Sequence, residues 1–284
     1  MSEPTGPAEL HAIAHSQLGD AYRLYRFGRY LPGAALAVGV LVMFFPKIAY
    51  LGAVAALIIQ GAIWYTRQTA QQKQAVGDEI RRRALLSDAL GQFDQAFDLA
   101  ELLGKVSDEV REHAKARIKS DYFASKAPVG IIRLCDHLRE NSFWNRSLYS
   151  EASRLGKRIL WITATASIVV FLLAFYLAPQ DATVNVMRVF VVVVTFLLAY
   201  TFLIDVIAWQ SAANAIERLD RQLDSFKNLD ETSLLNRNGQ IMAILSEYTV
   251  ATSKVAPVPS KVYKENQVRL NKIWKERDSA TNSP

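Results

Sequence analysis

Two long stretches of the sequence are almost free of charge, and they constrain the fold more than any other feature. Residues 159–179 are 21 residues without a formal charge. After the polar link 180–183, a second and largely apolar stretch extends to residue 209. A helix rises about 1.5 Å per residue, so about 20 apolar residues cross the hydrocarbon core of a bilayer. The pair predicts a transmembrane helical hairpin. Two buried helices in a large core are the alternative, which fits less well because the first stretch is apolar on every face.

A shorter pair of apolar stretches lies nearer the N-terminus. Residues 31–45 and 48–65 are separated by Pro46 and Lys47, and proline does not continue a helix comfortably. Two spans are therefore favoured over one re-entrant element. The predicted fold is an all-α membrane protein with four transmembrane helices in two hairpins and cytoplasmic helical extensions. Its segments are an N-terminal helix (1–30), hairpin 1 (31–66), a helical domain (67–158), hairpin 2 (159–209) and C-terminal helices with a tail (210–284).

The distribution of positive charge predicts the orientation. All of the 33 Lys and Arg residues except Lys47 and Arg188 lie outside the two hairpin tips. Because positive loops stay on the cytoplasmic side, both termini and the 67–158 segment are expected in the cytoplasm. A net charge of +6 fits contact with an inner leaflet better than binding of nucleic acid, which is not an expected partner.

The sequence contains no recognisable catalytic motif, so an enzyme is not expected. Cys135 is the single cysteine, and it lies two residues from His137, so the two do not share a helical face. With four scattered histidines, neither a metal nor a resident cofactor is expected. Asp205 leaves two alternatives open: an ionisable group on an ion path within the membrane, or a residue beyond the hydrocarbon, with Trp209 as the interface anchor.

Residues 216–226 carry a short heptad-like pattern. Apolar side chains recur three and four residues apart at Ile216, Leu219, Leu223 and Phe226. This is typical of a coiled coil but covers only two heptads. Because four spans enclose no obvious channel, a homo-oligomer in the lipid bilayer is expected.

Three local patterns resemble the SMODS-associated four-transmembrane effector family. The segment LRENSFWNRSLY (138–149) resembles the R-x-N-x-x-W-[DN]-x-x-L pattern of that family. GQFD (91–94) resembles its Q-E-x-F-D stretch, and a C-terminal segment (238–266) resembles its Val-Pro and tyrosine region. The sequence departs from the family where Ile241 follows Gln240 and where only Asp121-Tyr122 stands for a Trp-Tyr pair.

This resemblance implies a membrane effector of nucleotide-signalled anti-phage defence in the bacterial inner membrane. A neighbouring nucleotidyltransferase would supply a cyclic nucleotide, the cytoplasmic part would bind it, and the spans would permeabilise the membrane. Cations would hold the phosphates and an aromatic ring would stack on a base. The candidate ligand-binding residues are Arg139, Asn141, Trp144, Arg133, Lys119 and Arg82.

Structural alternatives accompany each of these expectations. Arg139, Asn141 and Trp144 would serve equally as a hydrogen-bonded scaffold. The basic triplet 81–83 would serve as a solvated helix face beside anionic headgroups. The alternative function is a non-enzymatic membrane scaffold that recruits a cytosolic partner through its helices.

Overall fold

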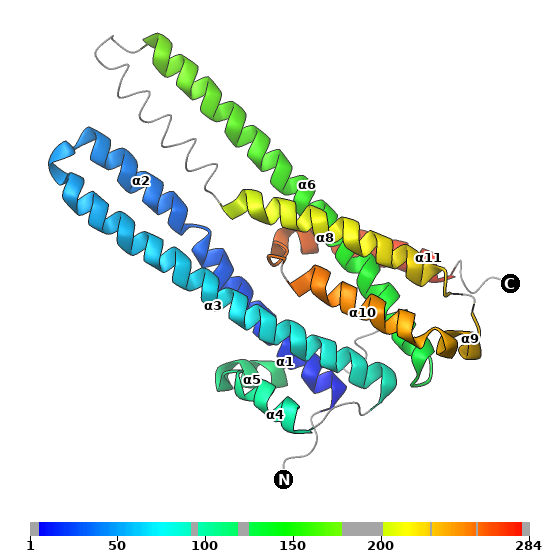
Figure 1. The fold of residues 1–284 in the computed structure, drawn as a ribbon. Helices are drawn as coiled ribbons and strands as arrows, with labels where there is room; N and C mark the ends of the chain where they lie inside the picture. The colour runs from blue at the N-terminus through cyan, green and yellow to red at the C-terminus, as the bar shows by residue number, and fades with distance from the viewer. Residues whose placement is uncertain are drawn as a thin grey trace. The chain divides into compact units, whose positions relative to one another are not determined.

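The computed structural model describes residues 6–91, 96–118, 125–177, 201–227, 229–253 and 255–279, and all regular structure within them is helical (Figure 1). The helical class predicted from the sequence is therefore confirmed. The helices are α1 (Pro7–Gly28), α2 (Leu31–Phe44), the 3₁₀ turn η1 (Pro46–Ile48), α3 (Ala49–Leu90), α4 (Ala96–Gly104), α5 (Asp108–Lys115), α6 (Ile131–Leu177), α8 (Thr201–Asp224), α9 (Glu231–Asn236), α10 (Asn238–Ser253) and α11 (Ser260–Ser279).

The predicted transmembrane architecture is wrong. Across the described ranges, no helix combines the length and the apolar character that crossing a bilayer requires. Helix α2 has 14 residues, which gives about 21 Å against a hydrocarbon core of about 30 Å. Most of the expected fourth span, residues 184–200, lies outside the described residues. The membrane-spanning character of the hairpins predicted at 31–66 and 159–209, a pore-forming role and a multi-pass location in the inner membrane with cytoplasmic termini are not supported.

Trp209, predicted as an interface anchor, is instead a core residue. It lies inside α8, is 1% exposed, and donates from Nε1 to the carbonyl oxygen of Ala256 at 2.8 Å. An indole buried in this way satisfies its one polar group within the protein.

The chain divides into two compact units, each assembled from separate stretches. Unit 1 comprises Met1–Tyr22, Gln71–Ala152 and Ala208–Pro284, and unit 2 comprises Arg23–Ala70 and Ser153–Ile207. Helices α1, α3, α6 and α8 contribute residues to both units. Each segment predicted from the sequence is continuous in the chain, whereas each unit is defined by contacts and contains two or three separate stretches.

One core of unit 1 forms where α1, α3, α4 and α5 meet. Gly77 of α3 permits the close approach of α1, because a Cβ built there would lie 2.9 Å from side-chain atoms of Leu18. Helix α3 ends before Gly91, whose φ of 85° suits a residue without a side chain. The buried residues of this core are Leu10, Ala12, Ile13, Ala14, Ile80, Ala84, Leu102, Val106, Val110 and Ala114.

The heptad-like stripe predicted at 216–226 belongs to the interior of unit 1. Its four apolar side chains lie in α8 or directly after it, and all are buried within the chain. A helix of a globular unit turns such a stripe toward its own core. The pattern therefore reflects intramolecular packing, with Ile216 and Leu223 fully enclosed.

Unit 2 contains the break predicted at Pro46. Helix α2 ends at Phe44, and the chain reverses through η1 before α3 begins. Elsewhere in the unit, the Tyr25 hydroxyl donates to Asp205, and Ser153 Oγ donates to the Val206 carbonyl at 3.3 Å. These contacts join α1 and α6 to the start of α8.

Candidate ligand-binding pocket

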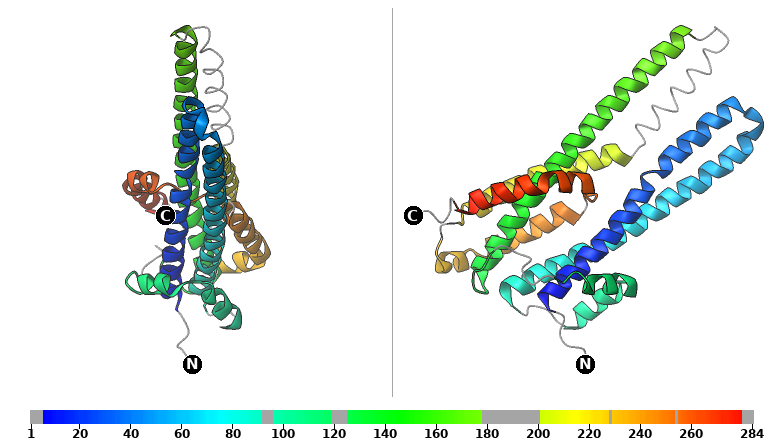
Figure 2. Two further views of the ribbon diagram at one scale, coloured as in Figure 1. Left: turned by 90° about the vertical axis from the view of Figure 1, so that its left-hand side faces the viewer. Right: turned by 180° about the vertical axis from the view of Figure 1, so that it is seen from behind.

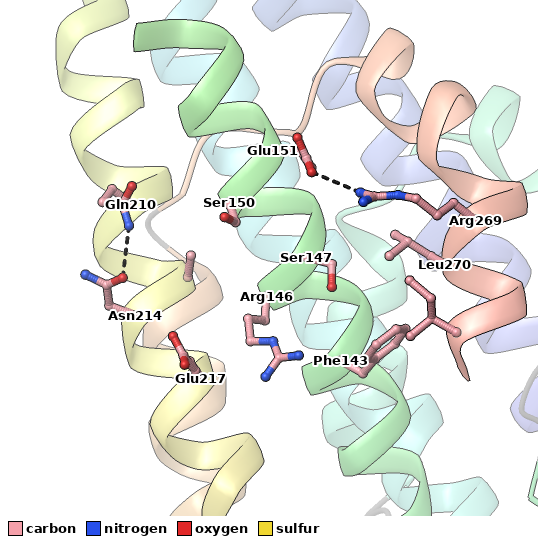
Figure 3. A pocket seen from close by; sticks show the side chains of 12 residues that line it. Phe143, Arg146, Ser147, Ser150, Glu151, Gln210, Asn214, Glu217, Arg269 and Leu270 are labelled. Atoms are coloured by element: carbon pink, nitrogen blue, oxygen red, sulfur yellow. Dashed lines mark hydrogen bonds and ion pairs between the residues drawn. The ribbon is translucent and has the colours of Figure 1, made fainter. Parts of the chain in front are cut away.

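A polar cavity of about 480 Å³ lies in unit 1 between α6, α8 and α11 (Figure 3). Its volume is within the range usual for small-molecule sites, about 300–1,000 Å³. Guanidinium, carboxylate, hydroxyl and amide groups line it together with a few apolar side chains. The lining residues are Phe143, Arg146, Ser147, Ser150, Glu151, Gln210, Ala213, Asn214, Glu217, Arg269, Leu270 and Ile273.

Helical periodicity explains why these polar residues face one cavity. On α6 they recur at 146, 147, 150 and 151, and on α8 at 210, 214 and 217. Residues three and four apart share a helical face. The opposite face of each helix is apolar and enters the core, as Leu138 does on α6 and Ile216 on α8.

Two arginines from different helices supply the positive charge of the pocket. Arg269 of α11 donates to Glu151 of α6 at 2.9 Å, as Figure 3 shows, and its side chain is 55% exposed. Arg146 of α6 is partly exposed and lies 2.9 Å from Asp220 of α8. A guanidinium offers five N–H donors in a fixed fork, which matches carboxylate and phosphate oxygens.

Carboxylates and amides complete the lining. A hydrogen bond from Arg221 lowers the pKa of Glu217, so this group is ionised at neutral pH. Gln210 donates to the side-chain oxygen of Asn214 at 2.9 Å. The pocket therefore combines paired charges with amides and hydroxyls that both donate and accept hydrogen bonds. It suits a ligand that carries a negative group and a polar ring edge.

Of the six residues predicted from the sequence to bind a ligand, the five that the structure describes do not line this pocket. Arg82 is held by Glu79 through bonds of 2.6 and 2.9 Å. Arg133 forms a fork on Asp88, with distances of 2.8–3.1 Å. Lys119 lies outside the described residues. These pairings give the predicted cations carboxylate partners within the protein.

The 138–149 motif contributes to packing around α6. Arg139 is buried, with Nε 3.5 Å from Asp224 and Nη1 3.8 Å from Asp136. Trp144 stacks on Tyr263 with ring centroids 6.2 Å apart, which joins two of the segments that carry the family resemblance. Asn141 is half-buried. Arg139 and Trp144 therefore make packing contacts around α6, and Arg146, which lies in the same 138–149 segment, lines the pocket.

A buried polar cluster forms a second feature of unit 1. His137 is fully buried and its Nε2 lies 2.6 Å from Asp88, which also receives Arg133. Burial lowers the pKa of His137, opposed by the hydrogen bond to Asp88. Burial also lowers the pKa of His11 on α1 to about 4, although the charge of Asp88 acts in the opposite direction. Both imidazoles are therefore neutral at pH 7, which favours a structural role in holding α1, α3 and α6 together.

Sequence reasoning did not single out Arg146 or Arg269. The spacing of the polar residues at 146, 147, 150 and 151 places them on one helical face, but polar residues are equally frequent in the preceding part of α6, so this spacing did not distinguish Arg146. No local signal marks Arg269 either, because its helix is polar on most of its surface and the pocket depends on contacts over 118 positions of sequence. Comparison of the chain with family models, with curated proteins and with solved structures gave no match.

Proposed function

We propose that unit 1 is a binding module for a small anionic ligand of nucleotide size, held in the pocket between α6, α8 and α11. The observation that carries the proposal is the placement of Arg146 and Arg269, from two different helices, around one polar cavity of about 480 Å³. Charge-assisted hydrogen bonds from guanidinium groups are about twice as strong as neutral ones, and they suit phosphate.

Several other groups of the pocket fit the remainder of a nucleotide. Asn214 and Gln210 can pair with the polar edge of a base, and Ser147 and Ser150 can bind ribose hydroxyls. Phe143 and Leu270 provide apolar surface. The sequence resemblance to nucleotide-signalled effectors makes cyclic nucleotides the first ligands to test. Membrane permeabilisation, which needs bilayer-spanning helices, is not part of the proposal.

The experiment is isothermal titration calorimetry of the full chain with cyclic di- and trinucleotides and with inorganic pyrophosphate. We expect saturable binding of at least one of these anions. Arg269→Gln removes one guanidinium from the pocket and should weaken that binding by about tenfold, since a hydrogen bond to a charged group contributes about 1.5–3 kcal/mol.

A second variant should raise the affinity for the anion instead of lowering it. Glu151→Gln removes the carboxylate that pairs with Arg269 at 2.9 Å and should strengthen anion binding. The negative charge of Glu151 no longer repels the anion, and it no longer competes with the anion for the guanidinium of Arg269. Lys272→Gln is the control, since Lys272 is an exposed cation of α11 outside the pocket. Absence of binding by every anion, with the protein folded, would refute the proposal. Equal losses in Arg269→Gln and Lys272→Gln would place the site elsewhere.

A further inference from the structure

A buried carboxylate connects the wall of the pocket to helix α11. Asp220 of α8 is 1% exposed, and two guanidiniums from different helices meet on it. Arg146 approaches from α6 at 2.9 Å, and Arg277 approaches from α11 at 3.0 and 3.2 Å. Arg146 also lines the pocket, so it belongs to both structures.

Arg277 attaches the end of α11 to the rest of unit 1. Besides Asp220 it binds Asp224 at 2.6 Å, and it lies over the rings of Phe143 and Trp274. Burial opposes its charge, but the hydrogen bonds to Asp220 and Asp224 outweigh burial and raise its pKa. The right-hand view of Figure 2 shows α11, in red, passing across α6 and α8. The docking of α11 therefore depends in part on how strongly Asp220 binds Arg277 in the presence of Arg146.

We infer that Arg146 and Asp220 couple occupancy of the pocket to the docking of α11, so that α11 is held more tightly when an anion is bound. The inference rests on the proposed function, because it assigns a regulatory consequence to the same site. An anion in the pocket competes with Asp220 for Arg146. Asp220 is then neutralised by Arg277 alone, and the attraction between these two groups increases.

The electrostatics of the shared carboxylate give the coupling this sign. Arg146 and Arg277 are like charges on one carboxylate, so each weakens the binding of the other. The low polarity around a buried carboxylate makes this competition stronger than it would be in water. Arg269, which belongs to α11, gives the bound anion a direct contact with the same helix. The stronger Asp220–Arg277 pair and the contact between Arg269 and the anion both strengthen the docking of α11.

The test is amide hydrogen exchange of peptides from α11, measured by mass spectrometry with inorganic pyrophosphate as the probe. The reference sample contains sodium chloride at matched ionic strength. We expect exchange in α11 to slow by about fivefold or more at saturation, which is the lower end of typical coupling between sites. Pyrophosphate that binds without slowing exchange in α11 would overturn the inference and leave the proposed function standing.

A ligand-free variant tests the coupling independently of any ligand. Arg146→Gln removes the competing guanidinium and should slow exchange in α11 without pyrophosphate. A purely structural Arg146 would give the opposite result, because its loss would loosen α8 and α11 together. Unchanged or faster exchange in Arg146→Gln would therefore overturn the inference. Lys272→Gln on α11 is the matched control and should leave exchange in α11 unchanged. If exchange in α11 slows in Arg146→Gln but the wild type does not bind pyrophosphate, the electrostatic link between Arg146 and α11 stands and the proposed class of ligand is wrong.

Discussion

At the scale of single residues, Asp205 shows how burial determines the behaviour of a charge. The residue is buried in unit 2, where it accepts a hydrogen bond from the Tyr25 hydroxyl. Burial raises the pKa of Asp205, while the hydrogen bond from Tyr25 and the charges of Arg67 and Arg29 oppose that rise. Of the two alternatives left open by the sequence, neither describes this environment, which is a polar contact inside a helical unit.

Asp205→Asn should stabilise the protein at neutral pH. A carboxyl with a raised pKa in the folded state favours folding while it is protonated, and that contribution is lost as pH rises through the folded pKa. Asparagine is neutral at every pH and keeps an oxygen that accepts from Tyr25. We expect the melting temperature of the variant to exceed that of the wild type at pH 8 and to approach it at pH 4.

Asp230→Asn is the comparison variant for this effect. The hydrogen bond from Ser233 lowers the pKa of Asp230, which is exposed before α9. Its contribution to stability is present above the unfolded pKa, so its substitution should not raise the melting temperature at pH 8. A lower melting temperature for Asp205→Asn at pH 8 would contradict the assignment of Asp205.

Residue-scale pairings show which partners of the predicted cations could be found from the sequence. The pairs Asp78–Arg81 and Glu79–Arg82 are three residues apart on a helix, so local spacing gives a signal for them. The fork of Arg133 on Asp88 joins residues 45 positions apart, and no local pattern predicts it. Positive charge was visible in the sequence, whereas its neutralisation depended on the fold.

At the scale of helices, the docking of α1 depends on a buried imidazole. His11 lies on the buried face of α1, and its electrostatic neighbours are Asp88 and Arg81 on α3 and His137 on α6. Burial lowers its pKa from 6.5 to about 4. The neutral form is thus favoured in the folded state, and α1 must accommodate a charge or detach when that imidazole is protonated.

Acidification should therefore weaken unit 1 through His11. A depressed folded pKa gives stability that is present above pH 6.5 and is lost as pH falls toward 4. The pKa shift corresponds to a loss on the order of 3 kcal/mol. Urea unfolding at pH 7 and pH 4.5 should show a smaller pH dependence in His11→Gln than in the wild type.

The exposed histidine of α5 provides the control for His11. His113→Gln removes an imidazole that is largely in solvent, so the wild-type pH dependence should remain. The same pH dependence in His11→Gln and the wild type would show that His11 does not control the docking of α1.

Helix boundaries were predictable where a residue dictates the backbone and not elsewhere. The predicted break at Pro46 is present, because proline restricts the backbone locally. The boundary predicted between the helical domain and hairpin 2, at residues 158 and 159, is not a helix end, since α6 runs through it and through Gly156 to Leu177. One glycine costs a helix about 1 kcal/mol, which packing on either side outweighs.

At the scale of the whole molecule, unit 1 depends on contacts between distant parts of the chain. Gln74 of α3 donates to the Val255 carbonyl at 2.7 Å, and Trp209 of α8 donates to the next carbonyl, that of Ala256, at 2.8 Å. The Tyr22 hydroxyl of α1 receives the Ser260 amide at 3.2 Å. The proline-containing segment after α10 thus joins α1, α3 and α8.

Trp209→Phe tests whether this segment closes unit 1. The substitution removes the donor to Ala256 and leaves a part-buried carbonyl without this hydrogen bond, which costs about 1 kcal/mol. Loss of part of a fully enclosed side chain adds a cavity term of the same sign. We expect a clear fall in the urea midpoint, with the m-value unchanged, when unfolding is followed by circular dichroism.

Trp161→Phe is the matched control, because Trp161 is 75% exposed on α6 and its substitution should leave the midpoint unchanged. Trp209 should also account for the most blue-shifted tryptophan fluorescence, since its indole is enclosed, and that component should vanish in Trp209→Phe alone. Equal midpoints for the two variants would mean that the segment after α10 does not stabilise unit 1 through Trp209.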